Sequence, residues 1–452
     1  MTDHDPSLLL ATCARVLELV GDRAEAEVTV SAGRSGLTRF ANSFIHQNVA
    51  DNSQWARLKV VVGGRQATAG TSLLSTGLAD MVARALAAAA LRPPDPEWPG
   101  LVPPGGPVTA QPRPGADPRY DAATHVAEPG ARATVVKGFV DQGRRDGFEA
   151  AGFCQTAGHE VAFANSAGHR AWGRTTRAQV EGIHRSPVAD GGAQQVSARL
   201  ADLDGVAAGR RAADKARRSL ELVDLEPGDY EVVLEPGAVT DVLDFVMGHG
   251  FNAKAHAEGQ SFVRLGEQQL DPRLTIFDDP LDPRMIGLPF DAEGTPRRRL
   301  DLVRAGVAVG LCHDRRTARA AGAESTGHGS PGSEIGGPGP SHVVLEGGER
   351  SPEEIVASVG RGLLVTDFWY TRVLDPKTTV VTGLTRNGTF LIEDGRVTSA
   401  VRNLRFTQSY CEALAPGRVL AVGNDGRLAG ESMFFSPTLH LASWHFSGGA
   451  RG

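Results

Sequence analysis

The spacing of apolar and polar positions predicts an N-terminal half that mixes helices and strands. Apolar residues recur at helical spacing over residues 8–20 and are interrupted by Thr12, Arg15 and Glu18, which indicates an amphipathic surface helix. Strand-like alternation follows in three runs, residues 24–31, 37–49 and 54–62, and Gly63-Gly64 then offers a hairpin turn. The alanine-rich residues 78–91 predict a helix packed closely on this sheet.

A proline-rich loop interrupts this pattern over residues 92–119. It holds ten of the 27 prolines, which neither a helix nor a central strand tolerates, so we expect an exposed connector within the first domain. Helical spacing returns over residues 131–143 and 206–219, the second with a basic outer face. Between these two helices we expect three further strands, residues 148–156, 160–165 and 169–180.

The pattern changes near residue 222, where short strands and glycine turns begin to dominate. The run Gly322 to Gly348 contains nine glycines and is the longest glycine-rich loop of the chain. We therefore predict an α+β protein of two domains. Residues 1–221 form an α/β sandwich-like N-terminal domain, and residues 222–452 form a β-rich, barrel-like C-terminal domain.

Length and composition agree with this division and exclude several functions. A chain of 452 residues with 41% apolar and 22% charged residues is long enough for two globular cores. A net charge of -6 argues against a nucleic-acid-binding surface. The acidic first residues lack the basic start of a signal peptide, and the apolar runs are too short or too polar to cross a membrane.

The cysteines point to a reducing compartment. The four cysteines show no CxxC spacing, which favours reduced thiols and a cytoplasmic location. Each is more typical of a small buried apolar residue than of a metal ligand.

Common catalytic motifs are missing from the sequence. There is no GxxxxGK[ST] phosphate loop, no HExxH zinc helix and no GxSxG nucleophile turn. The informative segment is residues 234–262, where a strand is followed by Pro236 and by helical apolar spacing that ends at His249. His256 lies seven residues further, about 10 Å along a continuous helix at about 1.5 Å per residue. The two rings could share one zinc ion only if a loop followed Gly250.

Several segments, taken in order, carry a resemblance to a known family. TRFANSFIHQNV begins at Thr38, FANSAGHRAWG at Phe163 and STGHGSPG at Ser325, followed by PGPSHVVLEGG. RGLLVTDFW begins at Arg361 and NGTFLIEDGRV at Asn387. Together they resemble the TldD/PmbA family, also called the TldD/TldE peptidases, over nearly the whole chain.

The resemblance implies a metal motif that this chain has lost. Catalytic members carry HExxxH on the helix after the strand, and a late cysteine as a further zinc ligand. Their histidines and thiolate hold Zn²⁺, and the glutamate takes a proton from the attacking water. Here the aligned positions hold Asp244, Phe245 and, for the last histidine, His249. Residues 421–427, which resemble the region of the late cysteine, contain none, and Cys411 lies about ten residues earlier. We also expect Phe245 to be buried.

By this resemblance the chain is similar to the TldE/PmbA branch, which lacks the motif. Such a subunit assembles with a catalytic TldD-type chain carrying HExxxH into a closed particle that cleaves unfolded peptides, which are thought to bind by strand addition. We therefore expect a non-catalytic subunit with no cofactor of its own and with zinc in the partner subunit. We also expect it to act in the cytoplasm, without contact to nucleic acid or membrane.

Two alternatives stay open at the level of sequence. The first is a metal-dependent hydrolase with a rearranged site, in which Asp244 and His249 combine with one of His256, His313 or His328. The second is a stand-alone peptide-binding scaffold with no peptidase partner. The residues leave open whether this chain hydrolyses peptides by itself.

Overall fold

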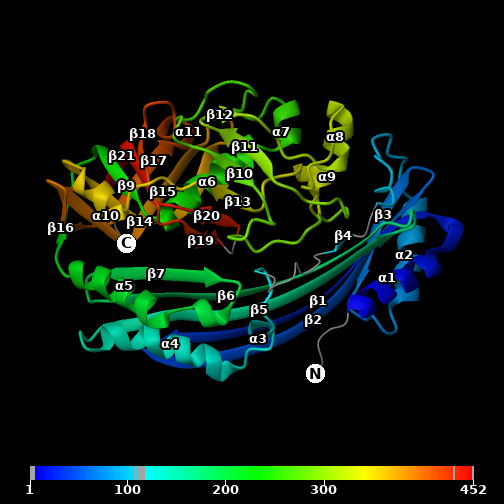
Figure 1. Cartoon of the computed structure of the whole chain (residues 1–452), viewed down its shortest axis with the longest axis horizontal. Helices are drawn as coiled ribbons and strands as arrows, with labels where there is room; N and C mark the ends of the chain where they lie inside the picture. Colours follow the sequence, from blue (N-terminus) through cyan, green and yellow to red (C-terminus); the bar gives the residue numbers. More distant parts are fainter. Residues whose placement is uncertain (1–5, 106–107, 110–117, 431–432, 450–452) are drawn as a thin grey trace.

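The computed structural model describes residues 6–105, 108–109, 118–430 and 433–449, arranged in two layers (Figure 1). The N-terminal layer is a long curved sheet with helices against it, and the C-terminal layer is a β-rich body that covers the concave side of the sheet. The seven strands of the curved sheet run in the order β3-β2-β1-β5-β6, and β4 and β7 both pair with β6. They are β1 (Glu25–Ala41), β2 (Phe44–Val62), β3 (Arg65–Thr71), β4 (Val108–Thr109), β5 (Glu149–Asn165), β6 (Arg170–Arg185) and β7 (Asp190–Ser197).

The strands of this sheet are longer than the sequence pattern predicts. The expected strands over residues 24–31, 37–49 and 54–62 are two continuous strands, β1 and β2, so the predicted division is wrong. The turn between them lies at Asn42 and Ser43, inside the second expected strand. Both residues take left-handed backbone angles, with φ of 50° and 63°, as a two-residue hairpin turn requires. The predicted turn at Gly63-Gly64 is confirmed between β2 and β3.

The same extension merges two strands that were expected to be separate. Residues 148–156 and 160–165 belong to one strand, β5, which pairs without a break along β6. The expected interruption fell near Gly158, where the strand passes under the ring of His125. A Cβ built on Gly158 would lie 2.2 Å from Nδ1 of that ring. Gly158 therefore allows the His125 ring to approach the backbone closely, and it does not end the strand.

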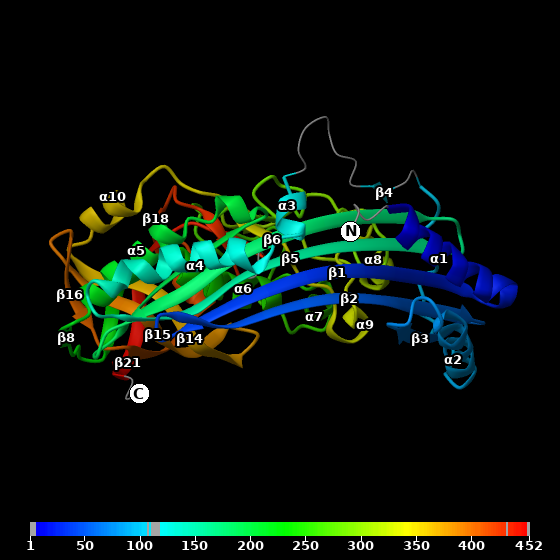
Figure 2. The ribbon, with the colours of Figure 1, turned by 90° about the horizontal axis from the view of Figure 1, so that it is seen from below.

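Helices cover the convex face of the sheet in two groups (Figure 2). The first pair packs at one end and the second pair at the other, each over its own apolar core. Their positions confirm the four helices expected from the apolar spacing. They are α1 (Pro6–Val20), α2 (Leu78–Ala90), α4 (Pro129–Arg144) and α5 (Gly205–Arg218), and one further turn, α3 (Ala122–His125), precedes α4.

The proline-rich loop connects the two layers. Arg315 donates to the backbone oxygens of Gly100 and Leu101, and Arg316 pairs with Asp95. The described part of the loop contains the short strand β4. Where burial is described, its residues are exposed or half-exposed except Val102, which is 7% exposed, so the predicted exposed connector is confirmed there apart from Val102. Residues 106–107 and 110–117 of the predicted loop lie outside the described residues.

The C-terminal layer contains a closed five-stranded barrel. Its strands follow the order β14-β9-β21-β17-β15, and pairing between β14 and β15 closes the ring. The barrel strands are β9 (Gly228–Leu234), β14 (Arg361–Asp375), β15 (Val380–Glu393), β17 (Leu404–Ser409) and β21 (Leu439–Gly449). They are flanked by β8 (Leu222–Val223), β16 (Arg396–Val401) and β18 (Val419–Val422). The predicted class, α+β with a barrel-like C-terminal part, is confirmed.

A second sheet of six strands lies beside the barrel in the order β12-β11-β10-β13-β20-β19. The largest apolar core joins this sheet, the barrel and helix α6. The strands are β10 (Ile276–Asp278), β11 (Leu300–Arg304), β12 (Val307–Ala308), β13 (Val343–Leu345), β19 (Arg427–Ala429) and β20 (Phe434–Ser436). The helices of this layer are α6 (Pro236–Gly250), α7 (Ala253–Ala257), α8 (Arg315–Ala321), α9 (Ser333–Gly336), α10 (Pro352–Ala357) and α11 (Tyr410–Ala413). The domain boundary between residues 221 and 222 stays a prediction.

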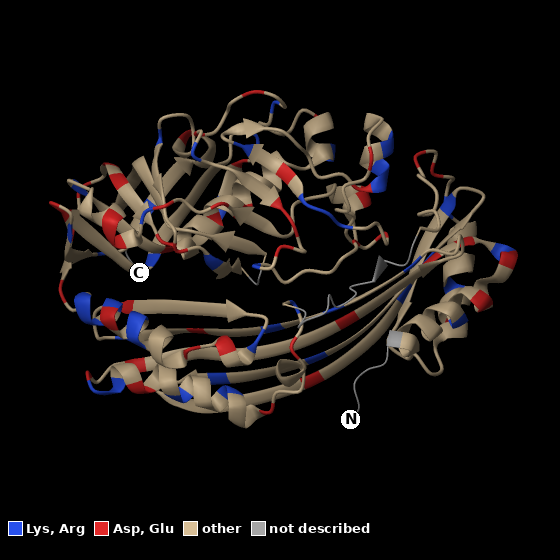
Figure 3. Ribbon diagram, viewed as in Figure 1, with Lys and Arg blue, Asp and Glu red and all other residues tan. Residues whose placement is uncertain are grey.

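Charged residues of both signs are interspersed over both layers, with basic positions concentrated along α5 (Figure 3). Within the described residues, no helix has the length and apolarity needed to cross a membrane. The four cysteines are free thiols, and three of them are buried.

Candidate functional site

Helix α6 has the form that the sequence predicts. Pro236 occupies its first turn, where the missing N–H costs no hydrogen bond, and the helix ends at Gly250. Its apolar face is fully buried in the large C-terminal core through Val239, Val242 and Val246. The helix therefore holds the three positions of the degenerate metal motif at its C-terminal end.

Two of those three positions form a ring contact. Phe245 stacks on His249 with ring centroids 6.2 Å apart, and its edge meets Tyr410 at 5.9 Å. Partial burial raises the pKa of Asp244, and the charge of His249 opposes this rise. Phe245 is only half-buried, so the expectation of a buried side chain is wrong, because this ring lies at the rim of the core.

The cysteine nearest to the expected late ligand is a protonated thiol. Cys411 lies on α11, and its Sγ–H donates to Oγ1 of Thr379 over 3.2 Å. Burial raises the pKa of this thiol to about 11, so it is not a thiolate at neutral pH.

The groups at these positions do not suit zinc. Within the described ranges, no three histidine, cysteine or carboxylate side chains converge as metal ligands would. Phe245 supplies no donor atom, and its ring lies against the one histidine that remains.

The other candidate histidines lie elsewhere in the C-terminal layer. His256 is on α7, His313 precedes α8, and His328 lies in the glycine-rich loop. Burial lowers the pKa of His313, and the charges of His256 and His328 lower it further, so these three share one neighbourhood. The His328 ring already contacts the carboxylate of Asp278.

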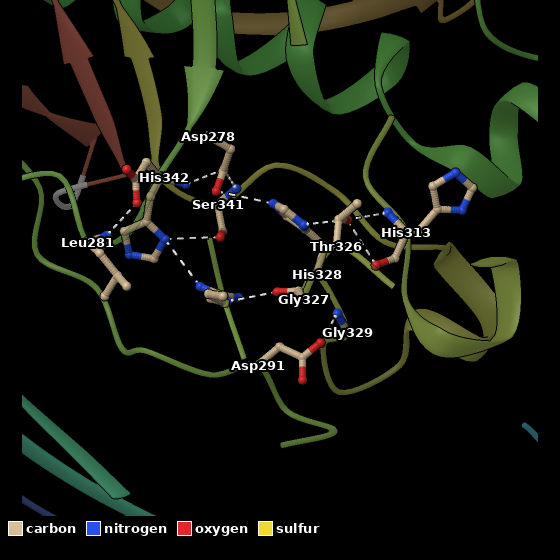
Figure 4. A network of polar contacts seen from close by, with 12 residues as sticks. Asp278, Leu281, Asp291, His313, Thr326, Gly327, His328, Gly329, Ser341 and His342 are labelled. Carbon is tan, nitrogen blue, oxygen red and sulfur yellow. Dashed lines mark hydrogen bonds and ion pairs between the residues drawn. The ribbon is translucent and has the colours of Figure 1, made fainter. Parts of the chain in front are cut away.

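Asp278, at the end of β10, is the centre of a buried polar network (Figure 4). Its Oδ2 accepts from the backbone N–H groups of Ser341 and His342 at 2.6 and 2.7 Å. Its Oδ1 lies 3.1 Å from Nε2 of His328, whose Nδ1 lies 2.8 Å from Oγ1 of Thr326. Burial would raise the pKa of Asp278, but the hydrogen bond and charge of His328 outweigh it and hold the pKa well below its ordinary value.

This network joins loops and does not form a catalytic triad. Asp278 accepts from the backbone N–H of His342 and not from its ring, so Ser341, His342 and Asp278 do not form a Ser–His–Asp relay. The His342 ring lies 3.0 Å from Oγ of Ser341 and 3.2 Å from the backbone oxygen of Ile286. Burial, followed by the charge of Arg297, lowers the pKa of His342 to about 4. The network therefore fixes the glycine-rich loop against β10.

A cavity of about 470 Å³ opens between the layers beside this network, lined partly by the glycine-rich loop. Asp291 accepts from the N–H groups of Glu293, Thr295 and Gly329. Glu293 accepts from the N–H of Arg315, and burial together with the charge of Asp291 raises its pKa to about 8. No sequence motif pointed to these carboxylates. The one signal that could have found Asp278 is a buried apolar strand that ends in two consecutive aspartates.

Comparison with known proteins identifies relatives of this chain. Residues 227–448 match the family model of the PmbA/TldA metallopeptidase C-terminal domain. A protein named metalloprotease from Methanothermobacter thermautotrophicus is 28% identical over 225 residues, which is 49% of this chain and 48% of that protein. A metalloprotease TldD homolog from Haemophilus influenzae is 27% identical over 47% of this chain and 45% of its own length. The chain thus matches about half of the length of these relatives.

The fold as a whole also has a solved counterpart. The structure of TldE from Thermococcus kodakarensis superposes with a TM-score of 0.83, covering 98% of this chain and 99% of that one. The two sequences are 21% identical, so this similarity is one of fold.

Proposed function

Because the chain is a member of the TldD/PmbA family, we propose that it is a non-catalytic subunit of a metallopeptidase complex that cleaves unfolded peptides. One observation carries this proposal. Where an active member needs a histidine and a glutamate, this chain has Asp244 and Phe245, and the Phe245 ring stacks on the remaining His249. Phenylalanine cannot take a proton from water, so the chain lacks a general base at that position.

The proposed partner is a related chain with an intact HExxxH motif, which would hold the zinc ion. The fold shared with TldE from Thermococcus kodakarensis supports a role of this kind. Two chains of one fold meet in a pseudo-symmetric contact, and an obligate contact buries more than about 2,000 Å² in total. The proposed compartment is the cytoplasm, whose reducing conditions suit four free cysteines.

Metal analysis with native co-purification tests the proposal. We expect the isolated chain to contain well under one zinc ion per molecule, because two of the three expected ligands are absent. Capture of a tagged copy from its own cells is expected to recover a chain with HExxxH, and that pair is expected to contain zinc and to cleave unfolded peptides. One tightly held zinc in the isolated chain would contradict the non-catalytic assignment. Recovery of this chain alone would favour a stand-alone scaffold.

Rebuilding the motif should not restore activity. We expect the double variant Asp244→His with Phe245→Glu to be inert towards unfolded peptides, because the late thiolate is still missing and catalytic zinc sites use three protein ligands. It should also be less stable by about 1–2 kcal/mol, since a carboxylate replaces a ring packed between His249 and Tyr410.

The matched control is Phe245→Gln, which removes the same ring without adding charge. Both variants are compared for cleavage of an unfolded peptide with and without a chelator, and for their urea midpoints. Chelator-sensitive cleavage by the double variant alone would mean that the site is nearly intact.

A further inference from the structure

A second and larger cavity, of about 1070 Å³, lies between the two layers at the end of the molecule where α5 is found. Its walls come from β5, β6 and β7 of the curved sheet, from α5, and from β14 and β19 of the C-terminal layer. The first turn of α6, through Pro236 and Gly237, also opens into it. We call it the α5 cavity. None of the degenerate motif positions lines it.

One wall of the α5 cavity is apolar and one corner is cationic. The apolar wall is formed by side chains from both layers, namely Phe153, Ile183, Val233, Val356 and Leu364. The cationic corner, as we name it, holds Arg211 and Lys215 of α5 together with Arg427 of β19. Apolar walls with a few convergent polar groups are typical of ligand sites.

The carboxylates near this corner already have partners. Oε2 of Glu235 accepts from the Lys215 ammonium over 2.6 Å. Oδ2 of Asp367 accepts from the Asn387 side-chain amide over 3.1 Å. Asp425, further along the wall, accepts from the N–H and the hydroxyl of Thr438. Each of these three carboxylates therefore has a hydrogen-bond partner other than Arg211 or Arg427.

Arg211 and Arg427 have no such partner. Neither guanidinium makes a hydrogen bond or ion pair with another residue in the part of the chain that the structure describes. They lie close enough that, after burial, the charge of Arg427 is the next cause of the lowered pKa of Arg211. The two cations repel each other, and an anionic ligand between them would relieve this repulsion.

A second, independent observation points to the same ligand. Thr366 of β14 lines the α5 cavity, is only 4% exposed, and its hydroxyl has no hydrogen-bond partner among the described residues. A buried hydroxyl without a hydrogen-bond partner destabilises the folded state by about 1–3 kcal/mol, so such groups usually form a hydrogen bond with a ligand or a water. The first turn of the 15-residue helix α6 adds a partial positive charge, and its N-cap residue Glu235 makes no side-chain cap.

We propose that the α5 cavity binds the C-terminal carboxylate of an extended peptide. Arg211 and Arg427 bind the carboxylate, and the apolar wall contacts the last side chains of the peptide. Lys215 is already paired with Glu235, so the guanidinium groups of Arg211 and Arg427 remain for a ligand, and their planar N–H groups match the two oxygens of a carboxylate. This inference rests on the proposed peptide-handling function and assigns it a recognition site away from the degenerate motif.

Binding of a labelled peptide to the full chain tests the inference. The probe is an unstructured peptide ending in leucine, compared with the same peptide carrying a C-terminal amide, and affinity is measured by fluorescence anisotropy. We expect the free acid to bind at least about tenfold more tightly, as one charge-assisted pair would give. In the double variant Arg211→Gln with Arg427→Gln, the acid is expected to bind no better than the amide.

The control is Arg210→Gln, one residue away on α5 but outside the cavity lining, which should leave the preference intact. Circular dichroism verifies that each variant folds, and Arg211→Lys, which keeps the charge, should retain part of the preference. Equal binding of acid and amide to the parent chain, or an unchanged preference in the double variant, would overturn the inference. So would displacement of the acid by inorganic phosphate at concentrations where acetate has no effect. Zinc content and partner capture are measured separately. If the chain captures its partner but binds acid and amide peptides equally, the carboxylate site is refuted and the proposed function is not.

Discussion

Replacing Asp278 with asparagine is expected to lower the free energy of unfolding by about 3 kcal/mol. The carboxylate is fully buried and serves three donors, the backbone N–H groups of Ser341 and His342 and the ring of His328. Asparagine keeps the shape but turns one acceptor into a donor that faces other donors, and the buried His328 ring loses its carboxylate partner. Urea denaturation followed by fluorescence and circular dichroism at pH 7 measures the change.

A surface pair of the same chemistry provides the control. Asp229 lies 2.8 Å from His445, but their side chains are 68% and 51% exposed, so Asp229→Asn should cost less than about 0.5 kcal/mol. The fold holds the pKa of Asp278 below its ordinary value, so its stabilising contribution is present above about pH 4 and is lost as the pH falls further. The difference between parent and Asp278→Asn should therefore shrink in acid. Equal effects of the two substitutions at pH 7 would show that the buried network does not hold the loops together.

Replacing Glu293 with glutamine is expected to stabilise the protein in mild alkali. The folded pKa of Glu293 is raised to about 8 from an ordinary value of 4.5. A raised carboxyl pKa means that the fold prefers the protonated form, so this contribution is fully present below pH 4.5 and is lost as the pH rises through 8. Glutamine keeps the acceptor for the Arg315 N–H and never ionises. At pH 8.5 the variant should be more stable by about 2 kcal/mol, and at pH 4.5 the two should be nearly equal.

The measurement is a set of urea midpoints at pH 4.5, 6.5 and 8.5 for the parent and the variant. Taking the difference between them removes the contributions of groups that do not interact with Glu293. Glu324→Gln, at an 86% exposed side chain paired with Arg298, is the surface control and should leave the midpoints unchanged. A difference between parent and Glu293→Gln that does not grow with pH would mean that Glu293 is ionised in the fold throughout this range.

The spacing of apolar residues correctly predicted elements, such as helix α6, whose formation depends on residues close together in the sequence. Helix α6 was expected from Pro236 and from apolar residues that repeat at helical intervals, and both features act within a few turns of the chain. The error in the first hairpin has an equally local cause. Asn42 and Ser43 take the left-handed backbone that a glycine pair usually supplies, so the turn carried no glycine signal.

The sites depend on contacts that no local pattern reveals. Asp278 contacts His328 because β10 and the glycine-rich loop pack together. No sequence motif in either segment predicts this contact. Arg211 and Arg427 come from different layers and are neighbours only in the folded chain. By contrast, the proposed loss of the metal motif follows from the sequence alone, because it concerns residue types at three aligned positions of one helix.

The order of the barrel strands has a consequence for synthesis of the chain on the ribosome. Strand β9 pairs on one side with β14 and on the other with β21, the last strand of the chain. The strands of the curved sheet, in contrast, all precede residue 198. At about 5–20 residues per second, β9 waits on the order of 10–40 s for β21 to be translated. During that interval its apolar edge is open to other nascent chains. The N-terminal layer can fold well before then, and we expect it to be the first structured part of each new molecule.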